Sequence, residues 1–207
     1  MIRANHHFLI NPFFRRYSIR KIRRHFHEVT IEGSVQDRGL PILLLSNHVS
    51  WWDGFWATWL NEKRFHRKLF FMMKEEMLRK HSYFQKAGGY SVKKGSRSIV
   101  ETLNYTAELL ADSRNLVLVF PQGRIESAYT PSFRFAKGIE SILRKTKNEV
   151  QIIFLANLVD YFSNPKPGLY MYMREYSDVT QDILALESEY NAFYAECVGR
   201  QLGRAGS

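Results

Sequence analysis

Short apolar runs alternate with longer segments of helical periodicity along most of the chain. Five runs have the length and the aliphatic or aromatic content of buried strands, at residues 41–46, 68–73, 116–120, 150–155 and 169–173. Apolar residues recur at helical spacing in five other segments, at about 53–62, 75–85, 97–112, 134–146 and 180–199. This alternation predicts an α/β fold, a single domain with a central, largely parallel mixed sheet flanked by helices.

Residues 1–30 differ from the rest of the chain because basic and apolar side chains are interleaved there. Seven Arg or Lys residues stand against one acidic residue, and the segment is rich in Phe and Ile. Pro12 is expected to break the helix. The composition is typical of an interfacial helix on a membrane, and a packed helix with a solvated basic face is the alternative. We therefore divide the chain into a basic amphipathic N-terminal segment, 1–30, and a domain at 31–207.

The chain carries 30 basic and 20 acidic residues, a net charge of +10. This charge favours an anionic partner such as nucleic acid, an anionic membrane surface, or a phosphorylated or acyl-carrier substrate. A basic nucleic-acid-binding module is one alternative, but no RNP-like aromatic strand or zinc-finger spacing supports it, so no nucleic acid is expected. The single cysteine, Cys197, excludes an internal disulfide, and the histidines form no recognisable metal-ligand set, so no metal is expected.

Two polar clusters follow predicted strands, at 46–53 and 121–127. Ligands in α/β folds usually bind beyond the carboxyl ends of the strands. His48 and Asp53 are five residues apart, so an Asp53 in the first turn of a helix can accept a hydrogen bond from one ring nitrogen of His48. The other nitrogen is then free to take a proton from an alcohol. The alternative is structural, with His48 capping a turn and Asp53 favoured by the helix dipole.

Two further features have structural explanations. The four tryptophans at 51, 52, 56 and 59 are expected to pack in the core, with an acyl-chain groove or an interfacial belt as the alternative. Gly88 and Gly89 are expected to form a turn before the amphipathic helix.

Four sequence blocks resemble those of glycerolipid acyltransferases of the lysophosphatidate acyltransferase type. In order along the chain they are NHVSWWD at 47–53, GGYSVKK at 88–94, FPQGRIES at 120–127 and FAKG at 135–138. The resemblance implies that residues 31–207 form an acyltransferase domain in which His48, oriented by Asp53, is the general base. A hydroxyl of a lipid acceptor would then attack the thioester of acyl-CoA or an acyl-carrier protein, with no other cofactor. No apolar run approaches the roughly 18–20 residues that span a bilayer, and the first residues lack the pattern of a secretory signal, so we expect a cytoplasmic protein, peripheral on the inner face of the cell membrane.

The second and third blocks depart from the family pattern. Lys94 replaces an arginine that binds the acceptor phosphate, and an ammonium lacks the bidentate fork of a guanidinium. Gln122 replaces a glutamate, and Arg124 is displaced by one position. The resemblance implies that the substrate is bound by Lys94, Arg97, Gln122, Gly123 and Arg124. The acceptor is lysophosphatidate, another lysophospholipid or a hydroxyl on another lipid, and a catalytically inactive membrane-associated relative is a further alternative.

Overall fold

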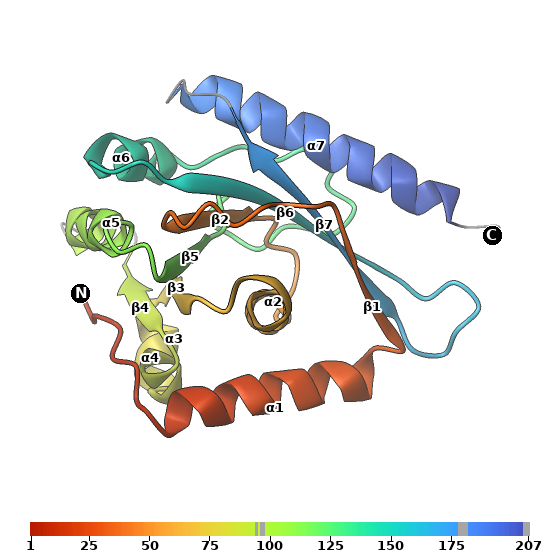
Figure 1. Cartoon of the computed structure of the whole chain (residues 1–207), viewed down its shortest axis with the longest axis horizontal. Helices are drawn as coiled ribbons and strands as arrows, with labels where there is room; N and C mark the ends of the chain where they lie inside the picture. Colours follow the sequence, from red (N-terminus) through yellow and green to blue (C-terminus); the bar gives the residue numbers. More distant parts are fainter. Residues whose placement is uncertain (94, 96–97, 178–181, 205–207) are drawn as a thin grey trace.

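The computed structural model describes residues 1–93, 95, 98–177 and 182–204. In this part of the chain seven strands form one sheet in the order β1-β7-β6-β2-β5-β3-β4, with helices on both faces (Figure 1). The fold is therefore the single, mostly parallel α/β domain that the sequence predicts. The strands are β1 (Glu28–Glu32), β2 (Ile42–Ser46), β3 (Lys68–Lys74), β4 (Gly89–Val92), β5 (Asn115–Val119), β6 (Gln151–Asp160) and β7 (Gly168–Tyr176).

The central strand β2 pairs in parallel with both β5 and β6, so that Leu45 lies opposite Val119 on one side and Phe154 on the other. The pairing of β6 with β7 is antiparallel, which makes the sheet mixed. All five residues of β2 are buried. A strand covered on both faces lacks an apolar–polar alternation, which explains the uninterrupted apolar run in the sequence.

Helices cover both faces of the sheet. In Figure 1, α2 lies between α1 and the sheet, whereas α5, α6 and α7 lie on the opposite face. Side chains on β2 alternate between the two cores, because Ile42 and Leu44 pack toward α1 and α2 and Leu43 and Leu45 pack toward α5–α7. The helices are α1 (Ile10–His25), α2 (Asp53–Leu60), α3 (Glu75–Lys80), α4 (Tyr83–Lys86), α5 (Ser98–Leu109), α6 (Gly138–Lys145) and α7 (Ile183–Gly203).

The N-terminal helix α1 contains Pro12 in its first turn, so the expected helix break at this residue is wrong. A proline is tolerated in the first turn because its missing N–H would have no partner within the helix. The helix buries Phe14 and Ile22 in the core that it shares with α2. Residues 1–30 and the rest of the chain therefore share one hydrophobic core.

Other differences from the predicted elements lie at short or irregular segments. The edge strands β1 and β4 are not predicted, and Gly89 begins β4 while Gly88 alone adopts a turn conformation, with φ +110°. The predicted helix 75–85 is two short helices, α3 and α4. The chain continues from α2 into one π-helical turn, Asn61–Phe65. No helix in the described ranges is long and apolar enough to cross a membrane.

Candidate active site

The two predicted polar clusters meet at one edge of the sheet. Because β2 and β5 are parallel neighbours, the loops that follow them leave the sheet side by side. The backbone N–H of Glu126 donates a hydrogen bond to the carbonyl of His48 over 2.9 Å. This bond joins the loop after β5 directly to the loop that carries the candidate base.

His48 and Asp53 form a hydrogen-bonded pair. Asp53 is the first residue of α2, and its Oδ2 lies 2.6 Å from Nδ1 of His48. The same oxygen accepts hydrogen bonds from the backbone N–H groups of Val49 at 2.9 Å and Ser50 at 3.0 Å. An ionised carboxylate only accepts, so this contact assigns the proton to Nδ1 and leaves the Nε2 lone pair to accept a proton.

Burial differs between the two members of the pair. The side chain of Asp53 is 1% exposed and that of His48 is 23% exposed, so only the histidine can meet a substrate. The imidazole stacks on the ring of Phe120, with centroids 4.0 Å apart and planes 12° apart. Burial raises the pKa of the Asp53 carboxyl, while hydrogen bonds from His48 and Ser50 act in the opposite direction.

A buried clamp that the sequence analysis does not identify fixes the start of the His48 loop. The side chain of Asn47 donates to the carbonyl of Asn157 over 2.9 Å and accepts from its backbone N–H over 2.8 Å. Asn157 also donates from its amide to Oγ of Ser46 over 3.1 Å. All three residues are buried. The position of Asn47 next to His48 is the one sequence signal for this role, whereas Asn157 lies in an apolar strand with no motif.

The loop after β5 contains three of the expected substrate-binding residues. Gly123 has φ +64° and donates from its backbone N–H to the carbonyl of Phe120 over 3.0 Å, so the chain turns back beside the ring that contacts His48. Gln122 is 6% exposed, and neither atom of its side-chain amide has a partner among the described residues. The exposed Arg124 donates from Nε to Oε1 of Glu126 over 2.7 Å.

The other two expected substrate-binding residues, Lys94 and Arg97, lie outside the described residues. The strand before them, β4, forms the edge of the sheet and is separated from β5 by β3.

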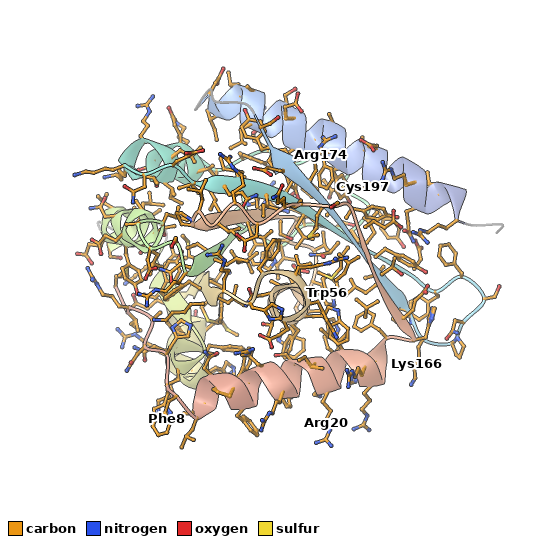
Figure 2. The ribbon with its side chains drawn as sticks, in the orientation of Figure 1. Phe8, Arg20, Trp56, Lys166, Arg174 and Cys197 are labelled. Atoms are coloured by element: carbon orange, nitrogen blue, oxygen red, sulfur yellow. The ribbon has the colours of Figure 1, made fainter. Side chains whose placement is uncertain are left out.

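The four tryptophans differ in burial, with Trp52 half-buried against the core that α1 and α2 share. Trp56 and Trp59 are buried, and Figure 2 shows Trp56 on α2 between α1 and the sheet. Trp51 is 62% exposed, so the expectation of core packing is wrong for this residue. It lies in the loop between His48 and Asp53, where its ring packs on Phe55 with centroids 4.8 Å apart.

Comparisons with known proteins identify the family of the chain. A protein-family model described as Acyltransferase matches residues 8–156. The chain belongs to the acyltransferase family. The matched region contains α1, both polar loops and most of β6, so it includes the His48–Asp53 pair and the loop with Gln122. A search of curated protein sequences gave no significant match.

Among solved structures, the acyltransferase resembles the 1-acyl-sn-glycerophosphate (LPA) acyltransferase PlsC from Thermotoga maritima. The TM-score is 0.63 at 16% sequence identity, and the match covers 92% of this chain and 78% of that chain. The two proteins therefore share a fold.

Proposed function

We propose that this acyltransferase transfers a fatty acyl group from acyl-CoA or an acyl-carrier protein to a hydroxyl of a lysophospholipid-like or other lipid acceptor. The family supports acyl transfer, and the fold shared with an LPA acyltransferase supports a lipid acceptor. The observation that carries the proposal is the 2.6 Å contact between His48 and the buried Asp53. A carboxylate in this position holds the tautomer of the imidazole and stabilises its protonated form.

In the proposed reaction, Nε2 of His48 takes the proton of the acceptor hydroxyl as its oxygen attacks the thioester carbonyl carbon. The new C–O bond forms and the carbonyl oxygen becomes an oxyanion. When the oxyanion collapses, the C–S bond breaks and the thiolate takes the proton from His48. The amides of Val49 and Ser50 already donate to Asp53, so they do not serve the oxyanion.

Substrate binding is assigned in the proposal to the loop after β5 and to the block after β4. The unpartnered amide of Gln122 is a buried donor and acceptor beside Phe120, which suits a polar atom of the substrate. Gly123 allows the chain to turn toward the site, and Arg124 supplies a positive charge. Lys94 and Arg97 complete the proposed set and would bind an anionic group of the acceptor.

The partner surface in the proposal is the inner face of the cell membrane. Phe8 and Phe13 are 78% and 68% exposed at the start of α1, and the ring of Phe13 stacks on that of Tyr17. Tyr17 contacts Phe55, which in turn contacts the exposed Trp51, so the aromatic surface reaches the His48 loop. Figure 2 shows Phe8 and Arg20 on the outer side of α1, pointing away from the sheet. Exposed apolar and basic side chains together favour an anionic bilayer surface.

The test is incubation of purified protein with labelled acyl-CoA or acyl-carrier protein and a total lipid extract, followed by mass spectrometry of new products. We expect one class of acylated lipid, with turnover reduced roughly 10²–10⁴-fold in His48→Ala. His81→Ala is a matched control outside the site. A folded wild-type protein that acylates no lipid with either donor would favour the inactive relative over the enzyme.

A further inference from the structure

A cavity of about 540 Å³ lies between the loop after β5 and the start of α7. It is lined mainly by charged and hydroxyl-bearing side chains. The lining combines two carboxylates with two guanidinium groups, from Glu126, Glu187, Arg124 and Arg134. Hydroxyls of Ser127, Thr130 and Ser132 add uncharged donors and acceptors. Such a lining has no excess of either charge.

Glu126 links this cavity to the candidate active site. Its backbone N–H bonds to the carbonyl of His48, and its side chain lines the cavity. Glu126 therefore contacts both the cavity and the His48 loop. The headgroup of an acceptor whose hydroxyl faces His48 can extend into this space.

The carboxylate of Glu126 and the guanidinium of Arg124 form an ion pair. The Glu126 side chain is 14% exposed and that of Arg124 is 75% exposed, and the pair is joined from Oε1 to Nε over 2.7 Å. Among the described residues, no hydrogen bond reaches the second oxygen of Glu126 or the terminal nitrogens of Arg124. The pair therefore presents an acceptor for a cation beside a donor fork for an anion.

A phosphate monoester fits this arrangement poorly. Its double negative charge would lie beside the sheltered Glu126 carboxylate, and a like charge in a partly desolvated site is strongly unfavourable. A headgroup that carries an ammonium and an anionic group satisfies both members of the pair.

We propose that this cavity selects a lipid acceptor with a zwitterionic headgroup, its primary ammonium bound by Glu126 and its phosphate or carboxylate by Arg124 and Arg134. The inference rests on the proposed acyl transfer and names the acceptor class for it. Glu126 is a specificity-determining residue in this assignment.

The test compares three acceptors with one acyl donor. Lysophosphatidylethanolamine supplies ammonium and phosphate, the lysine amide of a 3-hydroxy fatty acid supplies ammonium and carboxylate, and lysophosphatidate supplies phosphate alone. We expect kcat/KM for at least one zwitterionic acceptor to exceed that for lysophosphatidate by tenfold or more, and the better of the two identifies the anionic group. Glu126→Gln removes the charge and should lower this ratio roughly tenfold to a hundredfold.

Two further variants separate specificity from general damage. Arg124→Gln should lower kcat/KM for all three acceptors, since each has an anionic group. Glu140→Gln is the matched control, because Glu140 on α6 pairs with Arg144 outside the cavity. A wild-type preference for lysophosphatidate, or an unchanged ratio in Glu126→Gln, overturns the zwitterion assignment while acyl transfer stands. Acylation of none of the three acceptors or of any lipid in an extract overturns the proposed function itself.

Discussion

Replacement of Asp53 by asparagine should separate catalysis from folding. Oδ2 of Asp53 accepts three hydrogen bonds, from His48, Val49 and Ser50. An asparagine oxygen in the same position still accepts hydrogen bonds from this loop, so we expect the fold to be retained, but it no longer fixes the imidazole tautomer as the carboxylate does. The charge that stabilises the protonated imidazole is lost. We expect turnover to fall roughly 10²–10⁴-fold, which corresponds to about 3–5 kcal/mol of transition-state stabilisation.

The same substitution should lower turnover but raise the stability of the protein relative to wild type as pH rises. Burial raises the pKa of Asp53 above its ordinary value of 3.8, so the folded state binds the proton more tightly than the unfolded chain. The favourable contribution of Asp53 is fully present below about pH 3.8 and is lost as pH rises through the higher folded pKa. Relative to wild type, Asp53→Asn should therefore gain stability as pH rises above 3.8.

The assay pairs kcat/KM for acyl transfer with urea unfolding of both proteins from pH 4 to pH 8. Glu140→Gln serves as the control for loss of a surface carboxylate. Two results would contradict these expectations: wild-type turnover in Asp53→Asn, and a stability relative to wild type that falls as pH rises. The first result would remove the orienting role, and the second would mean that the ionised carboxylate stabilises the fold.

Three other predictions concern separate parts of the molecule. Asn47→Ala leaves the buried backbone N–H and carbonyl of Asn157 without their side-chain partner, which should lower the free energy of unfolding by about 1–3 kcal/mol and lower kcat more than it raises KM, as measured by urea unfolding and steady-state kinetics. Arg16→Ser with Arg20→Ser should weaken binding to anionic vesicles by about 1 kcal/mol per residue at low salt, whereas vesicle flotation that is unchanged would place the contact elsewhere. Burial lowers the pKa of His6, which bonds to the carbonyl of Leu69, to about 4. The stability that its neutral form contributes should be lost as pH falls from about 6.5 toward 4, so the hydrogen-exchange protection factors of residues 1–7 should fall over that interval but not in His6→Asn.

The substitutions in α1 are preferable to removal of the segment. A truncation of residues 1–26 would also delete Phe14 and Ile22, which lie in the core against α2. Loss of vesicle binding could then reflect unfolding. Arg16 and Arg20 are exposed, so their replacement leaves this packing intact.

The parts of the fold that the sequence predicted are those with a strong local pattern. The strand at 116–120 is apolar at every position because both of its faces are covered, and the run ends at a proline. The strand β4 begins with glycine and is four residues long, so neither alternation nor an apolar run marks it. Pro12 indicated a break because the sequence alone does not tell whether a proline falls in the first turn of a helix or further along.

The same distinction applies to the candidate site. His48 and Asp53 are five residues apart, so spacing alone suggested their hydrogen bond, and the structure contains it. The partner of Asn47 is 110 positions away, at Asn157, and no periodicity in the sequence relates the two. The exposure of Trp51 likewise depends on the path of the loop that leads into α2, which helical spacing does not determine.

The clamp between Asn47 and Asn157 also has a consequence for the order of folding. The His48–Asp53 pair is local and could form as soon as α2 does, but its support requires β6, which is made more than 100 residues later. Strand β2 likewise lies between two partners that both follow it in the chain, with β5 beginning at Asn115. Contacts of such long sequence separation form slowly. A nascent chain that ends before β6 therefore carries every motif residue of the family while the loop that holds His48 still lacks its anchor, and acyl transfer should begin only once β6 has docked beside β2.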